Sequence, residues 1–175
     1  MESARLDGWD YSGRGWYFVT ICTRGKQCHL GSAVNGQIVL SQAGSIAENE
    51  IRHIRDHYSN VILDKFVIMP NHVHAILVIE GDHVYSPAVV RRHAGDGASP
   101  VSTKRPVLGD IVGGYKAGVS RFCRAAGIVD FGWQARFYEH ILRSNAAVHA
   151  VRDYIDKNPE NWLEDPDRPA RIKYR

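Results

Sequence analysis

The sequence predicts an α+β domain in which helices pack against an antiparallel sheet. Two pairs of β-rich runs are each joined by a turn signal, at Asn35-Gly36 and at Pro70-Asn71, which indicates two antiparallel hairpins. Longer segments with apolar residues at helical spacing alternate along the chain with these runs. A helix with one apolar face must bury that face, and an antiparallel sheet can cover it.

The first half of the chain is expected to form a strand, a hairpin and a helix. The strand covers 16–23, where β-forming residues alternate. The Asn35-Gly36 turn then joins two short strands, the second at 37–40. Ser41 is a suitable N-cap for a helix that runs to about Tyr58. The apolar face of that helix comprises Ile46, Ala47, Ile51, Ile54 and Tyr58.

The second half is expected to add a central hairpin over 61–80, a helix over 107–126 and a short strand over 137–142. A last helix follows Ser144, a second suitable N-cap, and ends near Asn158 because Pro159 cannot continue it. Its apolar stripe comprises Val148, Val151 and Ile155.

Two segments carry no periodic pattern. Residues 81–105 combine Gly, Ser and Pro with four basic residues, and we interpret them as a mobile basic loop. Plain disorder and a clamp on a nucleic-acid backbone both stay open for this loop. Residues 164–175 are expected to form an extended tail. The chain shows no internal repeat, and its length fits one domain over 1–175.

Composition limits the partners only weakly. The net charge of +3 permits a nucleic-acid partner but does not argue for one. The three cysteines lack CxxC spacing, which favours neither a disulfide framework nor a zinc knuckle and is consistent with a cytoplasmic location. No apolar run reaches the length of a membrane span, and the first residues do not form a signal peptide, so we expect no membrane partner.

The most informative residues are two histidines and a tyrosine. In a strand, His72 and His74 lie on one face about 7 Å apart at Cα, close enough for both imidazoles to reach one metal ion. The alternative is a strand edge with two polar side chains. Tyr154 and Asn158 are four residues apart in the last helix, and therefore lie on the same flank beside its apolar stripe. The alternative for this tyrosine is ordinary core packing.

Taken in order, these motifs resemble the HUH single-tyrosine (IS200-like) transposase superfamily, and most closely its REP-associated tyrosine transposase branch. His72-Val73-His74 matches the His, apolar, His pattern, and Tyr154 to Pro159 matches the Tyr-Ile-x-x-Asn-Pro pattern. Further matches are Tyr17 to Thr23, Gly114 to Lys116 and Trp133 to Arg143. The resemblance runs from about Arg5 to Trp162.

This resemblance implies a ferredoxin-like or RRM-like palm whose central strand holds the histidines. It also implies that Tyr154 attacks single-stranded DNA at hairpin (REP-like palindromic) sequences, forming a covalent 5′-phosphotyrosine that a 3′-OH can reseal. His72 and His74 would hold Mg²⁺ or Mn²⁺, with Asn158 as the third ligand; insertion-sequence relatives carry Gln at that position. A homodimer and a monomer both remain open.

Other residues are weaker candidates for DNA contacts, because burial or ordinary surface charge explains each of them equally well. They are Lys116, Arg121, Trp133, Arg136 and His140, with Trp9 and Tyr11 near the start of the chain. Three other functions compete with the transposase hypothesis. They are a domesticated hairpin-binding protein that does not cut, an HUH replication initiator or relaxase, and a metal-dependent hydrolase that uses the histidines alone.

Overall fold

A computed structural model of the chain describes residues 14–80 and 106–162. The expected loop over 81–105, the tail over 164–175 and the aromatic residues Trp9 and Tyr11 lie outside the described residues. The strands are β1 (Gly15–Cys22), β2 (Gly31–Val34), β3 (Gln37–Leu40), β4 (Val61–Ile68), β5 (His72–Ile79) and β6 (Tyr138–Ile141). The helices are the 3-10 turn η1 (Arg24–Lys26), α1 (Gln42–Arg52), α2 (Ile54–His57), α3 (Leu108–Ala125) and α4 (Asn145–Lys157).

The main sheet has the strand order β4-β5-β1-β6, and every neighbouring pair is antiparallel. Strands β2 and β3 form a separate hairpin. Its turn residues Asn35 and Gly36 both have positive φ, as the Asn-Gly signal predicts. The α+β fold class is confirmed, and β5, which carries the two histidines, lies inside the sheet between β4 and β1.

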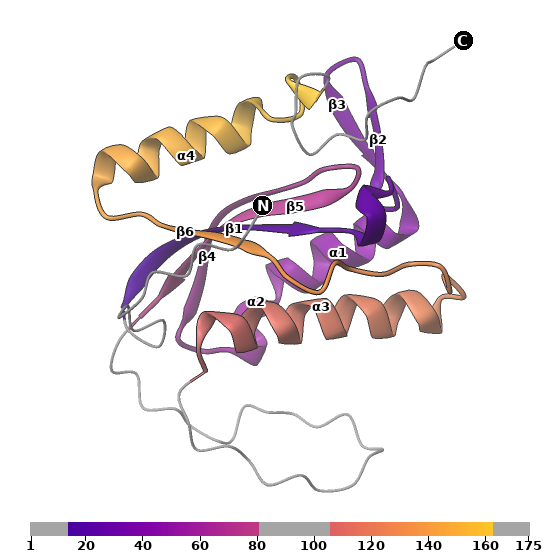
Figure 1. The fold of residues 1–175 in the computed structure, drawn as a ribbon, viewed down its shortest axis with the longest axis horizontal. Coiled ribbons are helices and arrows are strands. Elements are labelled where there is room, and N and C mark those ends of the chain that lie inside the picture. Colours follow the sequence, from indigo (N-terminus) through magenta and orange to yellow (C-terminus); the bar gives the residue numbers. More distant parts are fainter. Residues whose placement is uncertain (1–13, 81–105, 163–175) are drawn as a thin grey trace, which may run out of the picture.

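The two faces of the sheet are covered by different helices. Figure 1 shows α1 and α3 on one face and α4 on the other. Alternate residues of β5, from Val73 to Ile79, join the main hydrophobic core on the side of α1 and α3. Ile76 instead belongs to a small second cluster with residues of α4. Because strand side chains alternate, His72 and His74 share the face of Ile76 and therefore lie beneath α4.

The predicted helix from Ser41 to Tyr58 is wrong in one respect, since it is broken at His53. The Ser41 side chain caps α1 as expected, accepting a hydrogen bond from the Gly44 amide. His53 leaves the helical conformation (φ −95°, ψ 14°), and its Nδ1 lies 2.8 Å from the carbonyl oxygen of Asn49. The His53 amide still donates to that carbonyl at 3.2 Å, and the chain resumes as the short helix α2.

Helix α4 follows the prediction closely. The Ser144 hydroxyl accepts a hydrogen bond from the Ala147 amide at 3.1 Å, which caps the first turn. The helix ends at Lys157, one residue before Asn158. Val148 and Ile155 of the apolar stripe are buried against the sheet. Among the described residues, no helix is both long enough and apolar enough to span a membrane.

Candidate active site

The two histidines of β5 point at one another on the face that α4 covers. Their Nε2 atoms are 2.9 Å apart, and His72 and His74 are almost completely buried. Two ligand atoms on adjacent corners of an octahedral ion with bonds of about 2.1 Å would lie roughly 3.0 Å apart. The spacing of the two nitrogens therefore suits a shared cation, as their positions in the sequence predict.

Asn71 sets the hydrogen-bonding state of His72. Its Nδ2 donates to the carbonyl oxygen of Lys26, which fixes the orientation of the amide and turns Oδ1 toward His72 Nδ1 at 2.8 Å. An amide oxygen only accepts, so Nδ1 of His72 carries the proton and Nε2 keeps its lone pair. Burial, and to a smaller extent the charge of Lys26, lowers the pKa of His72 from 6.5 to about 3. His72 is therefore neutral at physiological pH, which is the state in which an imidazole can bind a cation.

The contact with Thr20 of β1 leaves the tautomer of His74 open. Its hydroxyl lies 2.9 Å from His74 Nδ1, and Thr20 pairs with His74 in the sheet. A hydroxyl can donate or accept, so either neutral tautomer of His74 is satisfied. With no cation present, His74 Nε2 can donate to His72. With a cation, Nδ1 can donate to Thr20 and leave the Nε2 lone pair for the ion.

Tyr154 meets the histidines from α4. Its hydroxyl oxygen lies 3.2 Å from His74 Nε2, and its ring stands edge-on to Phe18. The side chain is nevertheless 42% exposed, so a substrate could reach it. A tyrosine that served only as core packing would be covered. Both histidines and the tyrosine come together within one chain.

Asn158 follows Tyr154 by one helical turn, on the same flank of α4. In the sequence it lies between Tyr154 and Trp162. The Tyr154 hydroxyl contacts His74, and the centre of the Trp162 ring is 6.0 Å from that of the His72 ring. Asn158 is buried, and its Oδ1 has no hydrogen-bond partner among the described residues. A buried amide oxygen without a partner is costly, and it is a suitable donor for a hard cation.

These observations test whether the site could hold a divalent ion. Within the described residues, no group of three or more His, Cys, Asp or Glu side chains is placed to bind a metal. A site here would therefore consist of the two imidazoles and the amide oxygen of Asn158. This donor set fits Mn²⁺ and Mg²⁺, and its use as a metal site stays a prediction.

The candidate DNA contacts are scattered. Lys116 and Arg121 lie on α3, across the sheet from Tyr154, and the Lys116 ammonium donates to the carbonyls of Gln134 and Ala135. Trp133 packs against the rings of Tyr115 and Phe131. Arg136 is exposed in the segment before β6. His140, which is exposed on β6 and pairs with Phe18, lies on the face that carries Tyr154.

The sequence did not single out Asn71, Thr20 or Tyr138. Thr20 pairs with His74 on one side and with Tyr138 on the other, so the three side chains form a row across one face of the sheet. Tyr138 is 41% exposed. The signal for Thr20 and Tyr138 is the pairing of distant strands, which only the folded sheet reveals. Asn71 belongs to the Pro70-Asn71 turn and directly precedes the first histidine, but neither signal shows that its side chain contacts His72.

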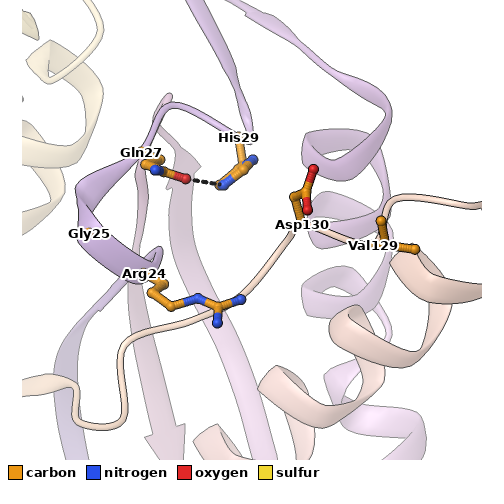
Figure 2. A pocket seen from close by; sticks show the side chains of 6 residues that line it. All are labelled: Arg24, Gly25, Gln27, His29, Val129 and Asp130. Carbon is orange, nitrogen blue, oxygen red and sulfur yellow. Dashed lines mark hydrogen bonds between the residues drawn. The ribbon is translucent and has the colours of Figure 1, made fainter.

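An open depression lies elsewhere, between η1 and the segment that follows α3. Its lining comprises Arg24, Gly25, Gln27, His29, Val129 and Asp130. Figure 2 shows these side chains around one opening, with a 2.8 Å hydrogen bond between Gln27 and His29. Neither histidine of the pair, nor Tyr154, nor Asn158 lines it, so it is separate from the candidate active site.

Solved structures identify the class of fold. A REP-associated tyrosine transposase bound to a REP hairpin is similar over 91% of this chain and 73% of that chain, with a TM-score of 0.53 and 20% identity. The chain has the fold of this transposase, which confirms at the level of the fold the relationship that the motifs predict. A Deinococcus radiodurans R1 protein described as a candidate transposase is more distant, at a TM-score of 0.45 and 16% identity over 89% of this chain and 96% of that chain.

Sequence comparison adds one relative. No protein-family model matches the chain. Over 164 residues it is 32% identical to an uncharacterized protein of Haemophilus influenzae strain Rd, covering 94% of this chain and 91% of that protein. The chain belongs to the same family as that Haemophilus protein.

Proposed function

We propose that the protein is a metal-dependent single-stranded DNA transposase that cleaves and rejoins DNA at hairpin sequences through a covalent 5′-phosphotyrosine on Tyr154. One observation carries the proposal: the hydroxyl of Tyr154, a residue that is partly exposed, lies 3.2 Å from His74 Nε2, which itself lies 2.9 Å from His72 Nε2. A tyrosine hydroxyl beside two imidazoles that could share a cation is an arrangement suited to phosphoryl transfer.

The roles of the side chains follow from this arrangement. His72, His74 and Asn158 would hold the cation, and the bound Mg²⁺ or Mn²⁺ would polarise the non-bridging oxygens of the scissile phosphate. Asn71 and Thr20 orient the two imidazoles through their Nδ1 atoms. The position of Tyr154 on a capped helix holds the phenol oxygen ready for attack on phosphorus.

The proposed reaction exchanges one phosphate ester for another. The bond between Tyr154 Oη and phosphorus forms while the bond from phosphorus to the 3′-oxygen breaks. The phenol loses its proton and the 3′-oxygen gains one, which leaves a free 3′-OH. Because bond energy is retained in the phosphotyrosine, a 3′-OH can reverse the attack and rejoin DNA without ATP.

Single-stranded DNA is the substrate that the site geometry favours. The structurally similar transposase is bound to a REP hairpin, and here the sheet surface next to the site exposes two side chains suited to unpaired bases. Tyr138 and His140 are two residues apart on β6 and face the same side as Tyr154. Exposed aromatic rings stack on unpaired bases at about 1–3 kcal/mol per base. The cluster is complete in one chain, which is consistent with a working monomer.

The decisive test is a denaturing gel of a labelled single-stranded hairpin taken from the DNA that flanks the gene. We expect a covalent protein–DNA band with Mn²⁺ or Mg²⁺ and none with a chelator. Tyr154→Phe should abolish the band while the hairpin still binds. Tyr138→Phe is the matched control, because it removes the hydroxyl of another exposed tyrosine on the same face and should leave the adduct intact.

Two results would contradict the proposal. If hairpins bind but no metal produces an adduct or a cut product, a hairpin-binding protein that does not cut explains the data better. If cleavage persists in Tyr154→Phe, the nucleophile is not this tyrosine, and hydrolysis at the histidines becomes the better explanation.

A further inference from the structure

Helix α4 is held to the sheet by a small apolar contact. Val148 and Ile155 are the two buried residues of this helix, and they pack with Ile76 and Leu142 in a cluster separate from the main core. Partly buried residues complete the cluster, namely Ala147 and Val151 of α4 with Trp16, Phe18 and Val67 of the sheet. A narrow stripe of this kind fixes the distance of a helix from a sheet better than it fixes rotation about the helix axis. The position of Tyr154 over the histidines depends on that rotation.

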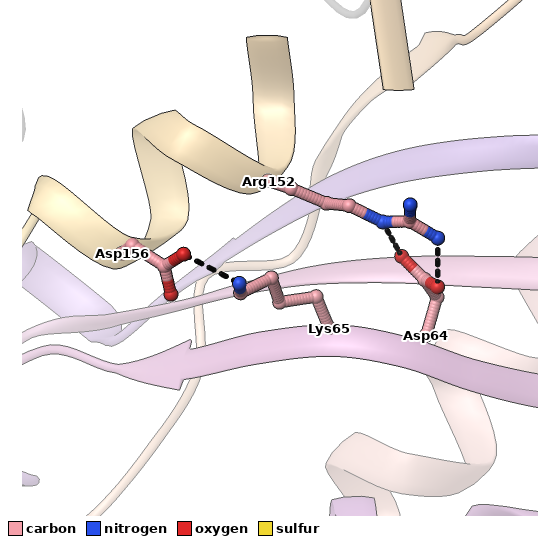
Figure 3. A network of polar contacts seen from close by, with 4 residues as sticks. All are labelled: Asp64, Lys65, Arg152 and Asp156. Carbon is pink, nitrogen blue, oxygen red and sulfur yellow. Dashed lines mark hydrogen bonds and ion pairs between the residues drawn. The ribbon is translucent and has the colours of Figure 1, made fainter. Parts of the chain in front are cut away.

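Two ion pairs tie α4 to the edge strand β4, as Figure 3 shows. Arg152 binds Asp64 with two hydrogen bonds, from Nε at 2.8 Å and from Nη2 at 2.5 Å. Lys65 binds Asp156 at 2.5 Å. The Arg152 guanidinium also lies 5.5 Å from the centre of the Trp16 ring, and its hydrogen bond to Asp64 raises its pKa. We refer to these two ion pairs as the α4 clamp.

The backbone of β4 is irregular at the clamp. Leu63 pairs with Leu77, and Lys65 pairs with Ile76, so Asp64 is an extra residue in the strand. In a regular strand, residues 64 and 65 would point to opposite faces. Both nevertheless form ion pairs with α4, which means that the bulge turns two consecutive side chains toward the same helix. A bulge that re-aims side chains beside a candidate active site suggests a role beyond general stability.

The clamp and the nucleophile lie on opposite flanks of α4. Arg152 and Asp156 are one turn apart on one flank, and Tyr154 is about 200° around the helix from Arg152. The Tyr154 hydroxyl lies roughly 9 Å from the helix axis, so a rotation of about 10° would move it by roughly 1.5 Å. Misplacement of a reacting group by about 1 Å can cost about 100-fold in rate.

We propose that the α4 clamp is a positioning device that fixes the rotation of α4 and so holds the Tyr154 hydroxyl against His74. Its residues on α4 lie on the opposite flank from Tyr154, and the clamp would act on the reaction through the position of the tyrosine. The inference rests on the proposed nucleophilic role of Tyr154. It adds that the bulged strand β4 helps to position this tyrosine.

The test compares hairpin affinity with the single-turnover rate of adduct formation. Arg152→Met should slow adduct formation by roughly 10- to 100-fold and change the hairpin Kd by less than about threefold. Arg152→Lys keeps the charge but loses the two-bond geometry, and should give an intermediate rate. The matched control is Arg52→Met, which removes the Arg52–Glu48 pair of α1 at 2.7 Å and the Arg52 contact with the Phe66 ring at 4.8 Å. Phe66 packs against the main core on the face away from α4, so this control should not change the rate.

A second readout does not depend on cleavage. With 3-fluorotyrosine at position 154, the fluorine resonance of the metal-free protein should move toward that of an exposed tyrosine in Arg152→Met and stay unchanged in Arg52→Met. The exchanged pair Asp64→Arg with Arg152→Asp should restore both the resonance and the adduct rate to within about tenfold of the parent.

The outcomes separate the two proposals. If the parent protein forms no adduct, the proposed function fails, and the fluorine resonance alone decides the clamp. If the parent forms an adduct but Arg152→Met and Arg152→Lys react within threefold of it, with an unmoved resonance, the clamp is overturned. An equal loss in Arg52→Met would overturn it as well, because the effect would then be one of general stability.

Discussion

Replacing His72 by glutamine should make the protein less sensitive to acid. His72 is buried beside Lys26, and this setting lowers its pKa to about 3, whereas an unfolded chain has an ordinary histidine pKa near 6.5. Between these values the unfolded chain binds a proton that the folded chain does not. Stability from this group is therefore complete above about pH 6.5 and is lost as the pH falls toward 3.

The magnitude follows from the two pKa values. Each pH unit between them costs about 1.4 kcal/mol of unfolding free energy, so lowering the pH from about 7 to about 5 should cost about 2 kcal/mol through His72 alone. His72→Gln removes the titrating group and should lose about 2 kcal/mol less than the parent over the same interval. The carboxylates and the other histidines contribute to both proteins and cancel in the comparison.

Urea unfolding followed by circular dichroism at the two pH values measures this difference. A chelator should be present, so that metal binding to the folded protein does not add its own pH dependence. His149→Gln is the matched control, because His149 is exposed on α4, and it should behave like the parent. If His72→Gln and the parent differ by less than about 0.5 kcal/mol in their response to acid, burial does not lower the pKa of His72 as argued.

Three further predictions use other features of the structure. Asn158→Leu removes a buried amide oxygen that has no partner among the described residues. In chelator, its free energy of unfolding should equal that of the parent or exceed it by up to about 1 kcal/mol, whereas its affinity for Mn²⁺, measured by calorimetry, should fall. Gly44→Ala should lower the urea midpoint because the added Cβ would collide with the Leu30 carbonyl. The Cβ of Gly113→Ala meets no atom within 4 Å, so this variant should raise the free energy of unfolding by about 0.5–1 kcal/mol. Tyr138→Ser should weaken binding of single-stranded DNA by about 1–3 kcal/mol in fluorescence anisotropy without slowing adduct formation at saturating DNA.

Features fixed by local chemistry could be predicted from the sequence. The Asn35-Gly36 turn needs positive φ at both residues, and few other residue pairs accept that conformation. Ser41 and Ser144 cap their helices through hydrogen bonds that span only three residues. The shared orientation of His72 and His74 needs no more than the period of a strand.

Features that depend on distant partners could not be predicted. Thr20 meets His74 only because β1 lies beside β5, and hydrophobic patterns do not give the order of strands in a sheet. The bulge at Asp64 is invisible in the sequence, because the apolar pattern of β4 reads equally well as a regular strand. The break at His53 lies within an apolar pattern that continues from α1 into α2, so the pattern does not show where α1 ends.

The departures from ordinary folding rules converge on one face of the sheet. On the side of α1 and α3, strand alternation produces a continuous apolar core. On the side of α4, two buried imidazoles face each other, the Asn158 amide oxygen has no partner among the described residues, and β4 contains an extra residue. Buried polar atoms without partners also occur at Asn60 and Trp133, so one such atom does not mark a site. A cation would satisfy the two imidazoles and the Asn158 amide oxygen, and the extra residue of β4 forms ion pairs with α4. Next to an exposed tyrosine, these departures are better explained by the proposed function than by stability.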